Sequence, residues 1–342
     1  MPERIDALAA YARERLVPGP RGRYAPTPSG PLHLGNARTA LIAWLQTRLQ
    51  GGRFILRIED LDRPRMRPGA AHGIIADLRW LGLDWDEGPE CGGPAGPYDQ
   101  SRRSVIYAQA LERLQRDHLA FECFCSRQDI RRAASAPHGD AEMPVYPGTC
   151  RGLSAAERRL KRELRKPAWR FRAGSGGIGF VDRLCGAVTD NLAESVGDFV
   201  IRRGDGVFAY QLAVAVDDAL MGISDVVRGA DLLGSTARQI ALLKALRLPV
   251  PDYWHVPLMH DPAGRRMAKR DGSDSIAAFR NAGGRPDELV GQLAASLNLI
   301  PSAEAVTPGA LLSELDLAGL RQRLIEARAE PGVMPESGIL VS

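Results

Sequence analysis

The hydrophobic positions of the chain first follow a strand pattern, over residues 21–25, and then a helical one. In the helical stretch they recur at i, i+3, i+4 and i+7, at Ala37, Ala40, Leu41, Trp44, Leu45 and Leu49. This spacing predicts an amphipathic helix, and the glycine pair at 51–52 is a typical helix end.

The same alternation continues to about residue 118. A strand over 53–58 is followed by a helix over 72–81, a Gly- and Pro-rich loop over 87–97 and a helix over 105–114. Strands that alternate with helices predict a parallel sheet covered on both faces. We therefore expect an α/β fold.

The alternation returns after residue 193. It predicts a hairpin of 199–202 with 207–212, a buried strand over 214–218, a strand over 226–230, a helix over 236–246 and a last strand over 254–259. Beyond residue 273 the pattern predicts only helices, over 276–280, 287–297, 308–313 and 317–329.

Residues 119–193 interrupt this alternation. They hold a Cys-x-Cys pair, a turn-rich segment over 135–144, and a helix that begins at the capping box of Ser154 and Glu157. We expect an inserted α+β subdomain there. The α/β unit would then comprise 1–118 and 194–260, and residues 261–342 would carry a loop and a short C-terminal helical region.

The composition is that of an ordinary globular protein. No run of about 18 apolar residues occurs, and the first residues lack the apolar segment of a secretory signal, so we expect no membrane partner. The count of 5 cysteines is low and odd for a chain of 342 residues, which argues against a disulfide framework and for a reducing cytoplasm.

The net charge of +4 does not by itself indicate a nucleic-acid partner. The charge is uneven, however. Residues 151–172 hold nine basic side chains against two acidic ones, at Arg151, Arg158, Arg159, Lys161, Arg162, Arg165, Lys166, Arg170 and Arg172. This basic stripe suits a phosphate backbone, and a solvated helix face is the alternative.

The stretch RYAPTPSGPLHLGN, residues 23–36, joins the first strand to the first helix. It places His33 and Asn36 at a helix N-terminus, where unpaired N–H groups favour an anion. Gly30 and Gly35 would let a ligand approach closely. The stretch is neither GxGxxG nor a GxxxxGK[ST] loop, so it predicts a different kind of nucleotide-phosphate site.

This stretch resembles the HIGH-motif region of class I aminoacyl-tRNA synthetases, with residues 33–36 in the HIGH position. Residues 23–27 are similar to the form seen in the glutamate-specific branch. Downstream, the segment Arg266-Met267-Ala268-Lys269-Arg270 resembles the KMSKS loop of the same family. Ala268 stands where the family usually has serine. The resemblance covers residues 21–275 and implies a Rossmann-like catalytic domain.

The resemblance implies an ATP site with Mg²⁺ held mainly by phosphates and water. Its ATP-binding residues would be His33, Gly35, Asn36 and Lys269, of which His33, Asn36 and Lys269 would be catalytic. Donors at a helix N-terminus and a lysine on a loop suit the charge that develops when a carboxylate attacks the α-phosphate.

The resemblance also implies glutamate-binding residues, at Arg23, Tyr24, Ala25, Pro26, Thr27, Glu59, Tyr210 and Arg228. The chemistry agrees, because an arginine fork binds a carboxylate and an acidic side chain such as Glu59 pairs with an ammonium. Taken alone, Tyr210 would more readily be a core residue. Arg228 is harder to explain by packing, since arginine is seldom buried without a partner.

Three cysteines of the insertion, Cys123, Cys125 and Cys150, suit tetrahedral Zn²⁺. Ordinary zinc chemistry offers His138 as the fourth ligand, whereas the resemblance implies Tyr146, whose phenol a bound cation would help to ionise. We expect Tyr146 and one structural zinc per chain. Three buried reduced cysteines are the alternative.

Only 73 residues follow Lys269, too few for the helical anticodon-binding region of full-length glutamyl-tRNA synthetases. The chain most resembles the truncated glutamyl-Q tRNA(Asp) synthetase family. This implies a monomer that activates L-glutamate with ATP and transfers it to queuosine in the anticodon stem-loop of tRNA(Asp). A short glutamyl-tRNA synthetase that charges a 3′ end, an RNA-independent ligase and an inactive RNA-binding module are the alternatives.

Overall fold

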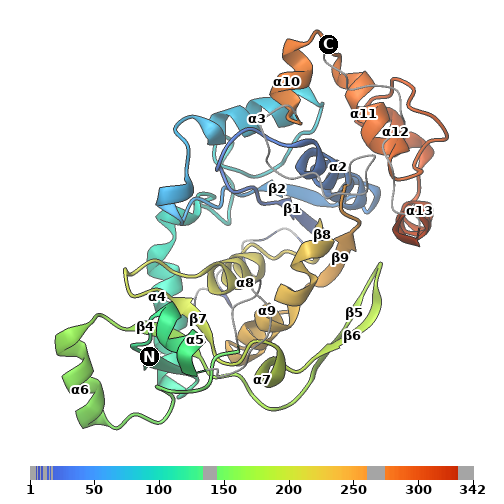
Figure 1. Cartoon of the computed structure of the whole chain (residues 1–342). Helices are drawn as coiled ribbons and strands as arrows, with labels where there is room; N and C mark the ends of the chain where they lie inside the picture. The colour runs from blue at the N-terminus through green and yellow to red at the C-terminus, as the bar shows by residue number, and fades with distance from the viewer. Residues whose placement is uncertain are drawn as a thin grey trace.

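A computed structural model of the chain describes residues 18–133, 145–259 and 274–329, with six isolated positions between Ile5 and Leu16. Its main sheet has six strands in the order β2-β1-β8-β9-β5-β6 (Figure 1). These strands are β1 (Arg21–Tyr24), β2 (Arg53–Leu56), β5 (Ile178–Asp182), β6 (Gly186–Asp190), β8 (Asp225–Gly229) and β9 (Asp252–Val256). All neighbouring pairs are parallel except β5 with β6.

A second, antiparallel sheet has the order β3-β4-β7, with β3 (Ala120–Cys123), β4 (Ala168–Phe171) and β7 (Phe199–Arg202). The helices are α2 (Leu34–Leu49), α3 (Ala70–Trp80), α4 (Ser104–Arg116), α5 (Arg127–Ala133), α6 (Ala155–Leu164), α7 (Leu192–Ser195), α8 (Tyr210–Leu220), α9 (Leu233–Ala245), α10 (Ile276–Asn281), α11 (Pro286–Ala295), α12 (Pro308–Glu314) and α13 (Leu317–Ala329). Short 3-10 turns are η1 (Arg63–Arg65), η2 (Gln100–Arg102) and η3 (Ala230–Leu232).

The main sheet is buried on both faces. Along β8, Val227 packs into one cluster with α2, and its neighbour Val226 packs into another with Ile240 of α9. This follows from the period of two in a strand. Helix α2 lies over one face, with α11, α12 and α13 packed against it, and α8 and α9 lie on the other side (Figure 1).

The order of the strands locates a switch point between β1 and β8. The chain leaves β1 through α2 to reach β2 on one side, and it leaves β8 through α9 to reach β9 on the other. Open α/β sheets hold ligands outside the carboxyl ends of the strands at such a point. We therefore expect ligand contacts from the residues that follow β1, β2, β8 and β9.

The predicted α/β fold with a largely parallel sheet is confirmed, but two predicted strands are wrong. The sequence pattern predicts strands over 207–212 and 214–218, whereas Tyr210–Leu220 is the helix α8. Of the hairpin only a single bridge remains, from Arg202 to Phe208. Every residue from Leu212 to Leu220 is buried, so the apolar run has no exposed face from which a helical period could be recognised.

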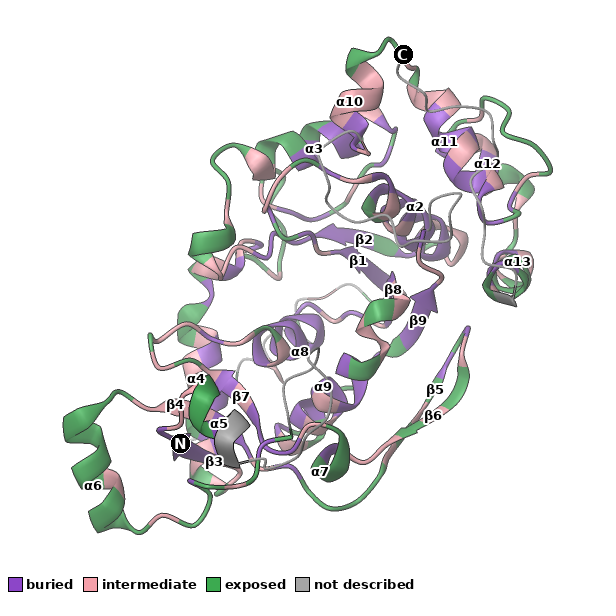
Figure 2. Ribbon diagram, in the orientation of Figure 1, coloured by how far each residue is buried: buried purple, intermediate pink, exposed green. Residues whose placement is uncertain are grey.

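The segment 119–193 does not form one separate layer. Its β5–β6 hairpin extends the main sheet, with Asp182 paired to Tyr253 of β9, and its strands β3 and β4 continue into β7. Helix α6 projects from the body and has no buried residue (Figure 2). The domain boundaries stay a prediction.

Among the described residues, no helix is both long enough and apolar enough to cross a membrane.

Two adjacent aspartates of α8 anchor a cluster of buried ion pairs. Asp217 accepts hydrogen bonds from Arg103 Nε at 2.6 Å and from Tyr107 Oη at 2.7 Å. Asp218 accepts from Arg57 Nη1 at 2.6 Å and from Arg23 Nε at 3.2 Å. All these charges are nearly inaccessible to solvent, so each depends on its partner for compensation.

Replacing Asp217 by alanine should destabilise the protein strongly, because Arg103 would stay buried without its carboxylate. We expect a loss of about 3–5 kcal/mol in the free energy of unfolding, measured by urea denaturation. Asp252→Ala is the matched control, since its pair with Arg183 at 2.6 Å is about half exposed and should contribute below about 1 kcal/mol. Similar losses in the two variants would show that burial does not decide how much each ion pair contributes.

Candidate active site and metal centre

A cleft of about 500 Å³ opens at the carboxyl ends of β1 and β8. Ten of the residues predicted for the ATP and glutamate sites line it: Arg23, Tyr24, Ala25, Pro26, Thr27, Gly35, Asn36, Glu59, Tyr210 and Arg228. His33 does not line the cleft but immediately precedes α2, and Lys269 lies outside the described residues. The structure thus brings together positions that are more than 200 residues apart in the chain.

The N-terminus of α2 faces this cleft. His33 is its N-cap residue, and the first amide, that of Leu34, donates to the carbonyl of Asp274 at 3.0 Å. The next two amides, of Gly35 and Asn36, have no acceptor among the described residues, and both residues line the cleft. Two open N–H groups at the positive end of a helix suit a phosphate.

Both ends of the segment that carries Lys269 lie beside this helix start. Met259, the last residue described before it, lines the cleft. On the far side, Ser275 forms a β-bridge with His33, and the amide of Ile276 donates to the carbonyl of Leu32 at 3.0 Å. The residues Arg266, Met267, Ala268, Lys269 and Arg270 themselves lie outside the described ranges.

Arg23 is held at the end of β1 by two neighbours. Its Nε donates to Asp218, and its Nη1 donates to the carbonyl of Val227 at 3.0 Å. Its Nη2 has no hydrogen-bond partner within the described part of the chain and remains available to a ligand. Burial alone would raise the pKa of Asp218, but Arg23 and Arg57 beside it hold this pKa below its ordinary value.

Glu59 supplies the acidic side of the cleft. Its Oε1 accepts from Arg57 Nη2 at 3.1 Å, and the side chain is almost fully buried. Burial raises the pKa of Glu59 against the opposing effect of Arg57. A cationic group bound next to it would favour the charged carboxylate, so this position suits an ammonium.

Tyr210, the first residue of α8, is 37% exposed and lines the cleft. This exposure contradicts the alternative that Tyr210 is a core residue. The helix begins here because the preceding chain leaves the β7 turn extended, with Ala209 as N-cap. The side chain is therefore partly open to the cleft, although burial raises the pKa of its phenol.

Arg228, at the end of β8, is only 4% exposed, and neutral groups hold it. Its three nitrogens donate to Gln239 Oε1 at 2.7 Å, Thr236 Oγ1 at 2.8 Å and His255 Nε2 at 3.0 Å. No carboxylate of a described residue lies within salt-bridge distance of this guanidinium. Sequence reasoning missed its three partners, because single polar residues in α9 and β9 carry no motif.

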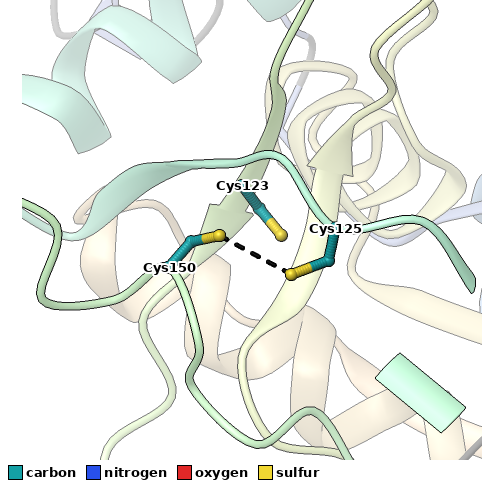
Figure 3. Close-up of side chains that lie close together, drawn as sticks. All are labelled: Cys123, Cys125 and Cys150. Atoms are coloured by element: carbon teal, nitrogen blue, oxygen red, sulfur yellow. Dashed lines mark hydrogen bonds between the residues drawn. The ribbon is translucent and has the colours of Figure 1, made fainter. Parts of the chain in front are cut away.

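The three cysteines predicted to bind metal lie together. Cys123 ends β3, and the Sγ atoms of Cys123, Cys125 and Cys150 all lie within 4.8 Å of one another. Figure 3 shows the three sulfur atoms directed at a common point, with Cys125 and Cys150 3.6 Å apart. Thiolates around a tetrahedral zinc lie about 3.8 Å apart, so the group fits such an ion.

Tyr146 completes this arrangement. Its Oη lies 3.4 Å from Cys123 Sγ and accepts the amide of Cys150 at 2.8 Å. Burial raises the pKa of Tyr146, and burial and the neighbouring Cys123 raise the pKa of Cys125 to about 12, so a bound cation would favour ionisation of these two groups. Burial alone would raise the pKa of Cys123, but Tyr146 and Arg170 lower it. The geometry favours Tyr146 as fourth ligand; His138 lies outside the described residues.

One member of the basic stripe has a different position from the one expected. Arg170 is buried, its guanidinium lies 3.9 Å from the centre of the Tyr146 ring, and it donates to the carbonyl of Asp198 at 2.7 Å. Arg170 and Phe171 point to opposite faces of β4 and both are buried, and the face of Arg170 packs on Tyr146. Six of the nine cations are exposed: Arg151, Arg159, Lys161, Arg162, Arg165 and Lys166.

The family described as tRNA synthetases class I (E and Q), catalytic domain, matches residues 21–296 of this chain. The chain belongs to this family. Among its relatives, the glutamyl-Q tRNA(Asp) synthetase of Symbiobacterium thermophilum is 52% identical over 90% of this chain and 96% of its own length. That of Nitratidesulfovibrio vulgaris is 49% identical, over 91% and 96%.

Among solved structures, the chain is similar to a glutamate tRNA ligase from Elizabethkingia meningosepticum in complex with its amino acid. The identity is 31% and the TM-score 0.78, and the match covers 88% of this chain but 66% of that one. As a class I tRNA synthetase, the protein is a ligase.

Purified class I synthetase of this sequence should contain about one Zn²⁺ per chain. Cys125→Ser should remove most of it and lower the thermal midpoint, because the ion joins two segments 25 residues apart. Metal analysis and thermal denaturation measure both effects. Cys91→Ser is the control, since Cys91 is exposed and far from the cluster in sequence. Full occupancy in a Cys123→Ser/Cys125→Ser double variant would exclude the site.

The fourth ligand can be tested in the same assay. Tyr146→Phe should weaken zinc retention against a chelator, whereas His138→Ala should leave it unchanged. The reverse result would assign the position to His138.

Proposed function

We propose that the protein activates L-glutamate with ATP as glutamyl-adenylate and transfers the glutamyl group to queuosine in the anticodon of tRNA(Asp). The observation that carries the activation step is the single cleft that joins a carboxylate-binding pair of arginines, an acidic residue and an open helix N-terminus. The acceptor rests on the name shared by the two relatives that match along almost their whole length.

The amino-acid half of the cleft has the charges that glutamate requires. Arg23 and Arg228 present guanidinium groups for the carboxylates, and Glu59 presents a carboxylate for the ammonium. Tyr210 adds a phenol at the rim. Because Arg23 and Glu59 each belong to the ion pairs around Asp218 and Arg57, they would bind glutamate with little rearrangement.

The ATP half is the start of α2. The amides of Gly35 and Asn36 and the side chain of Asn36 would bind phosphate oxygens, and Lys269 would approach from the segment anchored at Ser275. The glutamate carboxylate attacks the α-phosphorus, and pyrophosphate leaves. Negative charge on the phosphate oxygens grows in the transition state, where fixed donors stabilise it most. Mg²⁺ bound with ATP would neutralise further phosphate charge.

Lys269→Ala should slow glutamate-dependent pyrophosphate exchange by about 100-fold or more while the affinity for glutamate changes little. A cation that acts on transition-state charge has this effect. Lys244→Ala, at an exposed position of α9, is the control. Unchanged exchange in the Lys269 variant would remove this residue from the mechanism.

The RNA-binding part of the proposal uses the exposed cations of the basic stripe. Helix α6 projects away from the cleft-bearing sheet and offers Arg159, Lys161 and Arg162 to solvent (Figures 1 and 2). Such cations suit the phosphates of an RNA stem. The target base can then be splayed into the cleft, as single-stranded RNA bases commonly are. A monomeric state and a cytoplasmic location complete the proposal.

The acceptor is tested with labelled glutamate and two forms of tRNA(Asp), one with queuosine and one with unmodified guanosine. We expect labelling of the first only, and a steep fall in labelling as salt increases. Equal labelling of both forms would overturn the queuosine assignment. Labelling of tRNA(Glu) that is lost when its terminal adenosine is removed would identify a 3′-end synthetase. Glutamate-dependent exchange without labelling of any tRNA would indicate an RNA-independent ligase.

A further inference from the structure

A chain of three buried side chains lies behind the cleft: Asp182 of β5, His255 of β9 and Arg228 of β8. Asp182 Oδ2 lies 2.6 Å from His255 Nδ1, and His255 Nε2 lies 3.0 Å from Arg228 Nε. Asp182 and His255 have no measurable exposure, and neither lines the cleft. They are therefore placed to act on a ligand only through Arg228.

The contacts determine which nitrogen of His255 carries the proton. An arginine N–H can only donate, so Nε2 must accept from Arg228 and carries no hydrogen. The proton then resides on Nδ1 and is donated to Asp182. Burial lowers the pKa of His255, which agrees with a neutral ring. Burial alone would raise the pKa of Asp182, but its hydrogen bonds hold it at about 2.

Backbone groups fix the orientation of Asp182. Its Oδ1 accepts the amides of Leu184 at 3.0 Å and Cys185 at 2.8 Å, with the amide of His255 at 3.4 Å. Three donors around one oxygen leave only Oδ2 to face the imidazole. The carboxylate oxygen Oδ2 can therefore accept a hydrogen bond from His255 Nδ1. A donor group at the Oδ2 position would break this hydrogen bond.

We propose that Asp182 and His255 are positioning residues that set the tautomer facing Arg228 and thereby direct this guanidinium at a carboxylate of the substrate. This inference rests on the proposed activation of glutamate. The imidazole separates the charge of Asp182 from that of Arg228. A carboxylate bonded directly to Arg228 would compete with the substrate, whereas the lone pair of a neutral ring orients the guanidinium and leaves its charge for the ligand.

Asp182→Asn tests the proposal sharply. The three backbone amides should retain the amide oxygen of the new side chain at the Oδ1 position, which turns its NH₂ group toward His255 Nδ1. His255 would then accept at Nδ1 and carry its proton on Nε2, opposite the N–H groups of Arg228. Two donors cannot bond, so the guanidinium should lose the hydrogen bond of its Nε and keep those to Gln239 and Thr236. The new Nε2–H lies 3.2 Å from Thr236 Oγ1 and can be donated there instead.

The expected result is a rise in KM for glutamate of about 10- to 100-fold, with KM for ATP unchanged, in pyrophosphate exchange. Ring ¹⁵N NMR of His255 should show the proton on Nδ1 in the wild-type protein and on Nε2 in the variant. The two readings together separate a change of tautomer from a general loss of stability, which would affect both substrates.

Variants of His255 add a rescue. His255→Gln keeps an acceptor oxygen that can reach Arg228 and should retain most of the affinity for glutamate, whereas His255→Leu should lose it. Glu87→Gln is the matched control, because it alters an equally buried ion pair, with Arg21 at 2.7 Å, that lies away from the cleft. It should lower the urea midpoint without a selective effect on glutamate.

An unchanged KM for glutamate in Asp182→Asn, or a wild-type His255 protonated on Nε2, would overturn the positioning role. The proposed function fails differently: the wild-type protein would then show no glutamate-dependent exchange, while the ring ¹⁵N shifts would still report the tautomer.

Discussion

The carboxylate of Asp218 is the contact on which the cleft depends. It holds Arg23, from the end of β1, and Arg57, from the segment after β2, and Arg57 in turn holds Glu59. These groups come from three parts of the chain, and all are buried, so none is stable as a charge without the others. Their mutual compensation fixes one cation and one anion at the floor of the cleft before any ligand arrives, which is the kind of preorganisation that charged substrates require.

The two arginines of the cleft are compensated in different ways. Arg23 forms a direct ion pair and keeps one nitrogen for a ligand, whereas Arg228 is held by three neutral groups, one of which, the imidazole of His255, separates it from the carboxylate of Asp182. Arg23 should bind an anion more weakly, because Asp218 already compensates part of its positive charge. Arg228 is a buried cation held by neutral groups, so an anionic ligand would compensate its charge. A discriminating carboxylate contact is therefore expected at Arg228 rather than at Arg23.

The sequence predicted those features that depend on neighbouring residues. The helix N-terminus at His33 and Asn36 and the placement of Glu59 after a strand were both correct, since turn residues and hydrophobic period act locally. Helix α8 was missed because it is buried on all sides, so its apolar and polar positions do not alternate with a helical period. The pair of Asp182 and His255 could not be found, because it depends on β5 joining β9, 73 residues away, and no local signal reports that contact. Lys269 and His138 stay predictions.

The cysteine cluster lies next to the residues that hold the base of helix α6. Among the described residues, the buried group around the cysteines comprises Phe121, Cys123, Phe124, Ile130, Tyr146 and Cys150, a small core on which to hold a projecting helix by hydrophobic burial. Arg151 directly follows Cys150, and Arg162 of α6 forms a double hydrogen bond with Glu122, next to Cys123. A metal that ties Cys123 and Cys125 to Cys150 would therefore fix the base of α6 as well. Arg170, which packs on the Tyr146 ring, would also stabilise this metal site. Its positive charge would compensate the negative charge of the three thiolates and the phenolate.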